Sequence, residues 1–387
     1  MVFEEERISR IIRDLEKAMF SDIEPIVKYK ASNEECYKDK SYEYITGDLW
    51  GGYDKHQWFK VAVTIPERFK DKVVLFKITT GHEGEWDALN PQFLYYLDDN
   101  IMQGLDVNHR EVLITESAEA SREYSIDLFG YSGLTYNKET FYTELVVLDK
   151  LIEEFYYNIK VPLSVAELLD SNDENKIRTL VKLGKAVDML DLRRIYSDEF
   201  YNSLKTANDY LKNEFYSEIN YKCSVVTAIG HTHIDIAWLW TISQTKEKAV
   251  RSFATVLNLM KQYPDYKFMS SQPILYRFIK EKEHELYNEI KQRIKEGRWE
   301  ADGAMWLEAD CNIPSGESFI RQIILGNKFF KDEFGVESKS LWLPDVFGYS
   351  AALPQILKKS GISYFMTTKL DWNQFNTIPN DTFMWRE

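Results

Sequence analysis

Three side chains able to bind a metal recur at every second position in the stretch GHTHIDIAWLW, residues 230–240. His231, His233 and Asp235 come directly after the mostly apolar run at 225–229. If the backbone stays extended, residues at this spacing point to the same face of a strand. Imidazole nitrogens and carboxylate oxygens are common ligands of divalent metals such as zinc. The stretch predicts a metal site at the end of a buried strand, and a cluster of hydrogen-bonded polar residues is the alternative.

A second stretch, LWLPDVFG, places one carboxylate after another apolar run. Asp345 follows Pro344, and Gly348 allows the chain to turn back toward a helix. A carboxylate at this point can be a metal ligand, a nucleophile or a residue that caps a turn. After His233 the sequence has only one histidine, His284, which lies in a charged, helix-like segment. Either carboxylates complete the metal site or a further histidine lies beyond the last residue of this chain.

Tryptophans occur near several of the predicted strand ends. Functional groups in parallel β/α architectures gather at the carboxyl ends of the strands. Aromatic faces such as those of Trp238, Trp306 and Trp372 can stack on the C–H faces of pyranose rings, which favours a sugar ligand, whereas core packing explains any one of them alone. Further polar residues of the same segments are Glu308, Asp310, Lys369 and Asn373.

Four regions that differ in periodicity must position these residues, and together they predict a multidomain α/β protein. Residues 1–30 indicate an N-terminal helix, residues 31–136 an antiparallel β-sandwich, and residues 137–222 a helical connector. Residues 223–387 alternate strands with helices, one of which is expected to begin at Ser315 and end at Gly335. This is the pattern of a parallel sheet, open or closed into a β/α barrel. Because a complete barrel takes ~250 residues, we expect only its N-terminal part here.

The composition excludes several classes of protein. The net charge of −14 without a cluster of Lys or Arg argues against a nucleic-acid partner. No run approaches the ~18 apolar residues of a membrane span, and the charged N-terminus does not resemble a signal peptide. The three widely spaced cysteines indicate no disulfide framework. We therefore expect a cytoplasmic protein with no membrane partner.

The sequence resembles the retaining, zinc-dependent α-mannosidases of glycoside hydrolase family 38, in particular the cytosolic or vacuolar subgroup and its bacterial relatives. Four stretches carry the resemblance, in the family's order. They are GHTHIDIAWLW, GAMWLEADCNIPSGESFIRQ, WLPDVFGYSAALPQIL and TTKLDWNQFNTIPNDTFMWRE. The resemblance covers residues 223–387, and the preceding regions, with GLDVNHREV at 104–112, match the subgroup more loosely.

The resemblance implies roles for residues of GHTHIDIAWLW and of WLPDVFGYSAALPQIL. His233 and Asp235 correspond to zinc ligands, and Asp345 corresponds to a residue that is both zinc ligand and catalytic nucleophile. Trp238 corresponds to the tryptophan on which the sugar stacks. His231 is then expected to contact the metal-binding residues without binding the metal itself.

The implied reaction is hydrolysis of terminal α-linked mannose in an oligosaccharide, with retention of configuration and a covalent glycosyl-enzyme on Asp345. Asp310, Lys369 and Asn373 lie in segments that line the sugar site in such enzymes. The fourth zinc ligand, a histidine, and the acid/base carboxylate are implied to lie beyond residue 387. We therefore expect residues 1–387 to be an N-terminal fragment that alone binds zinc weakly and hydrolyses little. Large relatives of this kind commonly assemble, so a homo-oligomer is a further expectation.

Two other functions fit part of the pattern. Metal-dependent amidohydrolases and phosphoesterases also begin with His-x-His on their first strand, but they need further histidines, and none follows His284. A non-catalytic fragment is the third reading, with the β-sandwich as a carbohydrate-binding or oligomer-forming module and GLDVNHREV as its candidate surface.

Overall fold

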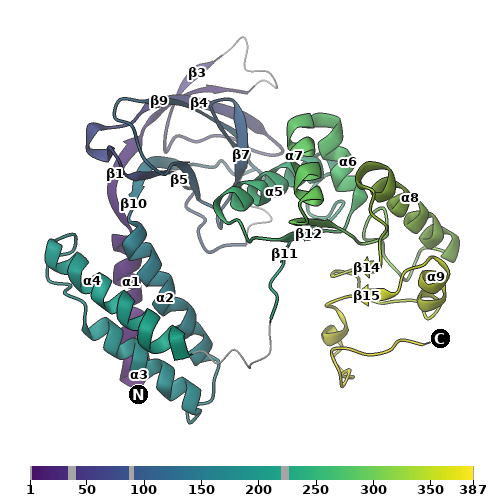
Figure 1. The fold of residues 1–387 in the computed structure, drawn as a ribbon. Helices are drawn as coiled ribbons and strands as arrows, with labels where there is room; N and C mark the ends of the chain where they lie inside the picture. The colour runs from purple at the N-terminus through teal and green to yellow at the C-terminus, as the bar shows by residue number, and fades with distance from the viewer. Residues whose placement is uncertain (1, 34–40, 87–90, 219–225, 387) are drawn as a thin grey trace.

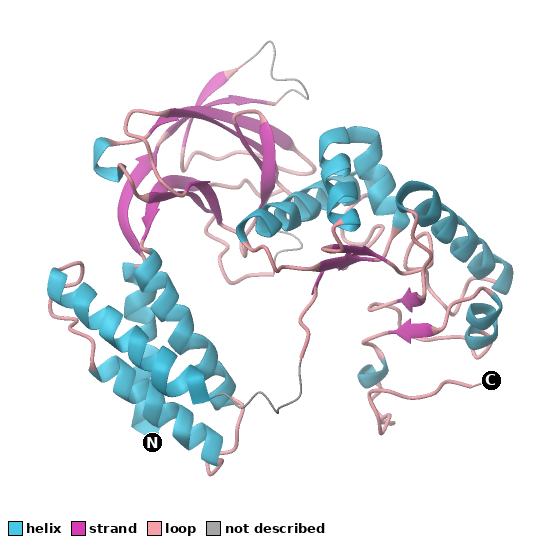
Figure 2. Ribbon diagram, viewed as in Figure 1, coloured by secondary structure: helices cyan, strands magenta, loops and turns pink. Residues whose placement is uncertain are grey.

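The computed structural model describes residues 2–33, 41–86, 91–218 and 226–386. The ribbon shows a helical bundle, a β-sandwich and a region of alternating helices and short strands (Figure 1). Figure 2 separates them by colour, with the bundle almost entirely helical and the long strands confined to the sandwich.

The sandwich consists of two antiparallel sheets, as the alternation in the sequence predicts. Its inward-facing residues are aromatic and β-branched, and Phe59, Phe76, Phe93 and Phe141 are fully buried between the sheets. The first sheet has the order β1 (Phe20–Ile26), β10 (Tyr142–Leu148), β5 (Val73–Thr79), β8 (Glu111–Thr115). The second has the order β3 (Tyr42–Ile45), β2 (Lys28–Ser32), β4 (His56–Thr64), β9 (Glu123–Tyr131), β6 (Gln92–Leu97), β7 (Asn100–Leu105).

Strands lie in two parts of the chain where the sequence predicted helix. Residues 20–26 form β1, although residues 1–30 were expected to be helical, and residues 142–148 form β10, although the helical connector was expected to start at residue 137. β10 pairs with both β1 and β5, and its valines and leucines are buried on both faces of the sheet, by the sandwich core on one side and by the helical bundle on the other. Its run of apolar residues also fits a helical period, and long-range pairing decides between the two. The Asp149 side chain ends the strand and caps the next helix, because it accepts hydrogen bonds from the backbone N–H groups of Leu151 and Ile152.

The helical bundle joins α1 at the N-terminus to three later helices. Their shared core is apolar and includes Ile8, Phe155, Leu183 and Phe200, and it continues onto the outer face of the first sheet through Val146. Side-chain caps at the starts of the three later helices define their boundaries. The helices are α1 (Val2–Ala18), α2 (Lys150–Glu167), α3 (Glu174–Asp188) and α4 (Asp198–Tyr210).

The last region alternates parallel strands with helices. The strands form a three-stranded parallel sheet, β11-β12-β13, and a two-stranded parallel sheet, β14-β15. Closure into a barrel is not shown by these two sheets and stays a prediction. The elements are β11 (Gly230–His231), α5 (Ile242–Gln262), β12 (Phe268–Ser270), α6 (Pro273–Lys282), α7 (His284–Lys295), β13 (Trp299–Ala301), α8 (Gly316–Phe334), β14 (Ser340–Trp342), α9 (Leu353–Lys359) and β15 (Tyr364–Met366).

The predicted helix between Ser315 and Gly335 is confirmed. The Ser315 side chain accepts a hydrogen bond from the backbone N–H of Ser318, and Gly335 ends α8 at a φ of 71°. A left-handed residue at this position favours glycine because glycine has no Cβ to clash.

α5 attaches the α/β region to the second sheet of the sandwich. Gly104 of β7 lies so close to α5 that a Cβ on it would stand 2.7 Å from the Cβ of Arg251. The Gly104 N–H donates a 3.0 Å hydrogen bond to the Thr255 hydroxyl of the same helix. In the following turn, Asp106 accepts from the backbone N–H groups of Asn108 and His109. The stretch GLDVNHREV is thus part of a turn and a domain contact, which is a structural use of the surface considered for sugar binding.

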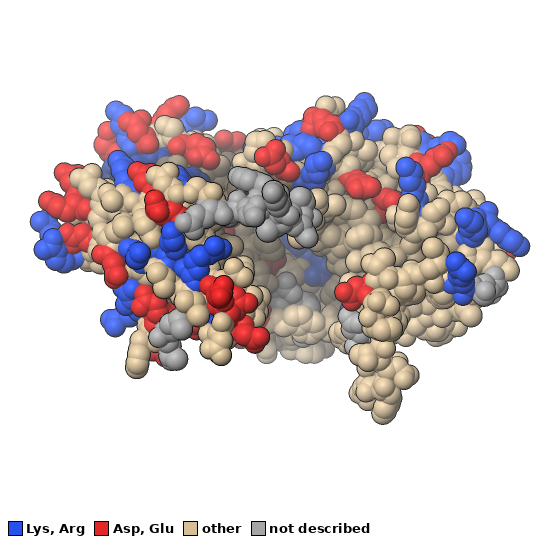
Figure 3. All heavy atoms as spheres, turned by 60° about the horizontal axis from the view of Figure 1, so that its bottom comes forward, with Lys and Arg blue, Asp and Glu red and all other residues tan. Residues whose placement is uncertain are grey.

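Two further features are the distribution of charge on one face and the character of the helices. On the face seen in Figure 3, acidic and basic side chains of the coloured residues are interspersed, with no broad basic area. Within the described ranges, no helix has the length and apolar character that crossing a membrane requires.

Candidate functional site

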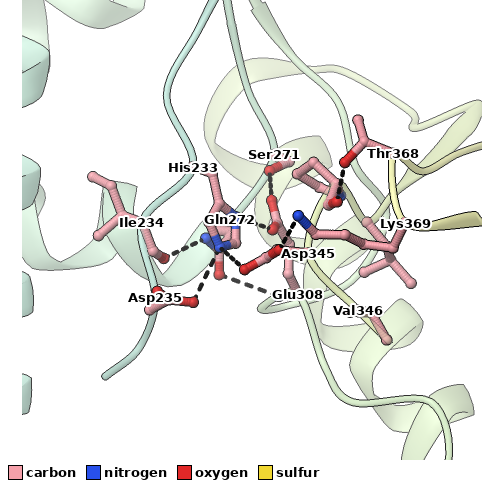
Figure 4. A network of polar contacts seen from close by, with 12 residues as sticks. His233, Ile234, Asp235, Ser271, Gln272, Glu308, Asp345, Val346, Thr368 and Lys369 are labelled. Atoms are coloured by element: carbon pink, nitrogen blue, oxygen red, sulfur yellow. Dashed lines mark hydrogen bonds and ion pairs between the residues drawn. The ribbon is translucent and has the colours of Figure 1, made fainter. Parts of the chain in front are cut away.

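The candidate site is built from the loops that follow the short parallel strands. β11 ends at His231, and the irregular segment after it carries His233 and Asp235. Asp345 follows β14 and Lys369 follows β15. Figure 4 shows the side chains of His233, Asp235, Asp345 and Lys369 pointing toward one another. The convergence follows from parallel strand direction, which brings the carboxyl ends of the strands to one side.

His233, Asp235 and Asp345 form a group, called the metal group below, with the composition of a divalent-metal site. One ligand atom from each lies within 4.8 Å of the others. The Nε2 atom of His233 is 3.0 Å from Asp235 Oδ1 and 3.7 Å from Asp345 Oδ2. All three side chains are partly buried, so an ion at this point would be partly shielded from water. One imidazole and two carboxylates match the ligand types that zinc accepts.

Glu308 fixes the orientation of His233. Its Oε2 atom lies 2.6 Å from His233 Nδ1, and its side chain is only 5% exposed. The hydroxyl of Ser271 donates to its other oxygen, and Gln272 accepts from its backbone N–H at 3.1 Å. Gln272 also donates to the backbone carbonyl of Ile234 at 2.8 Å. Because Glu308 lies beside Nδ1, the other ring nitrogen, Nε2, faces Asp235 and Asp345, which is the arrangement by which carboxylates orient metal-binding histidines.

The sequence put Glu308 at a strand end but assigned it no role. Its partner His233 is 75 positions away in the chain, and no local pattern reports such a pairing. One signal was present in the sequence. Glu308 is acidic and follows a run predicted to be a buried strand, and a buried carboxylate needs a hydrogen-bonding or charged partner.

The electrostatics around His233 favour a cation. Burial by itself lowers the pKa of His233, but hydrogen bonds to Asp235 and Glu308 and the charges of these carboxylates outweigh it and raise the pKa to about 10. Carboxylates that retain a proton on an imidazole in this way also favour a divalent ion in place of that proton. The residues therefore fit the metal that the sequence predicts.

His231 does not point to the same place as His233, contrary to the expectation for an extended strand. Its Nδ1 donates to the Met269 carbonyl at 3.0 Å, and its Nε2 accepts from the indole N–H of Trp342 at 3.2 Å. Burial lowers the pKa of His231, consistent with a neutral ring. The reason is that β11 ends at His231, so the alternation of an extended strand does not continue to His233. Both ring nitrogens are used in tying β11 to β12 and β14.

Lys369 pairs with the oxygen of Asp345 that faces away from His233. Its Nζ atom is 2.6 Å from Asp345 Oδ1 and lies 4.5 Å from the centre of the Trp372 ring. Asp345 is thus held on one side by an ammonium group, while Oδ2 faces the metal group. The Thr368 hydroxyl donates to the Pro344 carbonyl, which joins the two loops behind this pair.

The aromatic residues expected around the site have different environments. Trp238 is 52% exposed and Trp372 is 69% exposed, so both present indole surface to solvent. Trp306 is half-buried and packs edge-on against Phe329 of α8 at 5.7 Å, which is the core-packing alternative. A cavity of about 400 Å³ reaches His233 from the side of α5 and the sandwich.

Two predicted sugar-site residues, Asp310 and Asn373, make their contacts within their own loops. Asp310 accepts hydrogen bonds from the backbone N–H groups of Asn312 and Ile313. Asn373 accepts from those of Phe375 and Asn376. Both side chains shape exposed turns, and the structure does not bring them into contact with the metal group.

Comparison with known proteins gives the family. Residues 224–387 match the model described as glycosyl hydrolases family 38 N-terminal domain, and residues 17–140 match the model described as alpha-mannosidase, jelly roll domain. The chain belongs to glycoside hydrolase family 38 and corresponds to the N-terminal region of its α-mannosidases. The resemblance stated from the sequence is therefore confirmed.

Several curated relatives match over most of this chain. Alpha-mannosidase G of Dictyostelium discoideum is 33% identical over 380 residues, which are 93% of this chain and 33% of that protein. Alpha-mannosidase 2C1 of Mus musculus is 30% identical over 361 residues, 88% of this chain and 33% of that protein. Alpha-mannosidase of Saccharomyces cerevisiae is 40% identical over 223 residues, 57% of this chain and 19% of that protein. The chain thus spans at most about a third of the length of these relatives.

Proposed function

We propose that this chain forms part of a zinc-dependent retaining α-mannosidase that releases terminal α-linked mannose from oligosaccharides. The observation that carries the proposal is the meeting of His233, Asp235 and Asp345 within 4.8 Å, in the segment that matches the family model. The cytoplasmic location and the homo-oligomer expected from the sequence belong to the same proposal.

His233, Asp235 and Asp345 would hold the metal, with Glu308 keeping His233 in the required tautomer. A bound zinc ion would supply positive charge that orients sugar hydroxyls and stabilises charge developing in the transition state. The half-exposed indole of Trp238, three residues after Asp235, offers a flat surface for the ring of the mannose. Asp310 and Asn373 remain proposed contacts of the sugar through the parts of their side chains that their turns leave exposed.

Asp345 is the proposed nucleophile. Its carboxylate attacks the anomeric carbon while the bond from that carbon to the leaving oxygen breaks, and the leaving oxygen takes a proton from a general acid. Water then attacks the same carbon, frees Asp345 and returns a proton to the acid. Lys369 holds the nucleophile in place through the 2.6 Å ion pair. The acid must stand about 5 Å from Asp345 in a retaining enzyme, and its location beyond residue 387 stays a prediction.

The test uses the product of the complete reading frame that contains residues 1–387, assayed with an aryl α-mannoside. We expect hydrolysis that a chelator abolishes and zinc restores, and NMR of the first product should show the α anomer. Asp345→Asn should lower kcat by at least about 10³-fold, in line with the loss of a nucleophile that acts with other groups. The exposed Asp332→Asn on α8 is the matched control. Chelator-insensitive hydrolysis, or full activity of Asp345→Asn, would contradict the proposal.

A further inference from the structure

A loop of the sandwich reaches the proposed sugar site. Trp86 follows β5 and lies with its ring centre 5.2 Å from that of Trp238, the two planes meeting at 66°. Trp86 is 58% exposed and Trp238 is 52% exposed, so each indole presents surface to solvent beside the other. Two tryptophans from distant parts of the chain thus form an exposed corner, and one of them follows Asp235 by three residues.

The loop that carries Trp86 is held in shape by side-chain contacts. Glu83 accepts hydrogen bonds from the backbone N–H groups of Thr80 and Gly81, at 2.7 and 3.1 Å. The ring of His82 lies between Glu85, at 3.0 Å from Nδ1, and Glu139, at 2.9 Å from Nε2. The Glu139 side chain is only 7% exposed, so this contact anchors the loop to the interior of the sandwich. Trp86 is therefore positioned by the folded sandwich before any ligand arrives.

Trp86 and the proposed nucleophile come from different regions of the molecule, Trp86 from the loop after β5 and Asp345 from the loop after β14. Asp345 follows β14, and in the view of Figure 1 β11 lies between the sandwich and β14. In a displacement at the anomeric carbon, the nucleophile and the leaving group occupy opposite sides of that carbon. If the mannose ring stacks on Trp238, the part of the substrate next to that ring lies within reach of Trp86, whose ring centre is 5.2 Å from that of Trp238.

We propose that Trp86 binds the sugar ring of the leaving group. The mannose that is released would then stack on Trp238, and the neighbouring hexose would stack on Trp86 with its C–H face. This inference rests on the proposed function and extends it, because it makes the sandwich a determinant of substrate choice. A substrate whose leaving group has no ring gains nothing from Trp86.

The experiment compares two substrates in the product of the complete reading frame. An α-linked mannobiose has a hexose leaving group, and α-mannosyl fluoride has a leaving group without a ring. For Trp86→Ala, the ratio of kcat/KM for mannobiose to kcat/KM for the fluoride should fall about fivefold to tenfold, the value of one aromatic contact, mainly through KM. Trp86→Phe should restore most of the ratio, and Trp238→Ala should lower kcat/KM for both substrates.

The exposed sandwich residue Tyr136, 86% accessible, supplies the matched control Tyr136→Ala, which should leave the ratio unchanged. An equal loss on both substrates in Trp86→Ala would mean that Trp86 only braces Trp238, and this would overturn the inference while leaving the proposed function intact. A wild-type protein that hydrolyses neither substrate would overturn both. A zinc titration of each variant confirms that the metal group is unchanged.

Discussion

The sandwich and the α/β region use strands in opposite ways. In the sandwich, the nine-residue strands β4 and β9 pair along their whole length, and the space between the sheets is filled by rings such as Phe59. In the α/β region, β11 has two residues, and β12 and β13 have three each. Regular pairing there ends before the functional residues begin.

The two regions differ in the interactions that fix their structure. The interior of the sandwich is apolar, and its shape follows from packing and from continuous ladders. The site has buried polar groups, such as Glu308 and His233, whose positions depend on hydrogen bonds between loops. Side chains that must bind a ligand cannot be committed to core packing, so the loops after short strands carry them, and the sandwich supplies a rigid support.

Truncation of a core ring should have the largest effect on stability and a small one on the metal group. Phe59 is fully buried among Tyr29, Tyr44 and Trp50, so Phe59→Ala should lower the free energy of unfolding by about 3–5 kcal/mol. The midpoint of denaturant unfolding, followed by near-UV circular dichroism, measures this. The exposed control Tyr136→Ala should stay within about 0.5 kcal/mol of wild type. Similar shifts in both variants would show that the sandwich is not packed as described.

Removal of the charge on Glu308 should have a small effect on stability and a large effect on metal binding. Glu308→Gln keeps the shape of the side chain but loses the negative charge that lies 2.6 Å from His233 Nδ1, so zinc affinity should fall about 10–100-fold. Isothermal titration against a competing chelator measures the affinity directly. Glu317→Gln, in the exposed first turn of α8, is the control. Unchanged affinity in Glu308→Gln would mean that His233 needs no such support.

Gly104 tests how tightly the two regions are joined. In Gly104→Ala the new methyl group would start 2.7 Å from the Arg251 Cβ, so α5 must move, and stability should fall by about 1–3 kcal/mol. Thermal unfolding measures this loss. Gly316→Ala is the control, because the nearest atom to a Cβ there is 3.8 Å away. If both variants melt at the wild-type temperature, the contact between β7 and α5 is looser than the structure shows.

The smallest expected effect is a pH dependence of the loop that carries Trp86. Burial lowers the pKa of His82, but its hydrogen bonds to Glu85 and Glu139 outweigh this, and the pKa in the folded protein lies above 6.5. The contribution of protonated His82 to stability is therefore complete below pH 6.5 and disappears as the pH rises through the folded-state pKa. The stability difference between wild type and His82→Asn should be largest near pH 6, under about 1 kcal/mol, and smaller at pH 9. A difference that grows with pH would contradict this assignment.

The sequence by itself determined the properties that depend on neighbours along the chain. The helix from Ser315 to Gly335, the alternation of the sandwich strands and the family motifs are local patterns, and they were predicted correctly. The set of His233, Asp235 and Asp345 came from the resemblance to the family, because Asp345 lies more than 100 positions from the other two. Local chemistry suffices for the helix and the sandwich strands because caps and periodicity involve residues a few positions apart.

Only the tertiary structure decided the contacts between distant residues. It turned His231 toward Met269, paired His233 with Glu308 and placed Trp86 beside Trp238. It also made residues 142–148 a strand, since β10 exists only through its pairing with β1 and β5. Such outcomes depend on which segments meet in space, and the energy of a contact does not depend on how far apart its partners lie in the sequence.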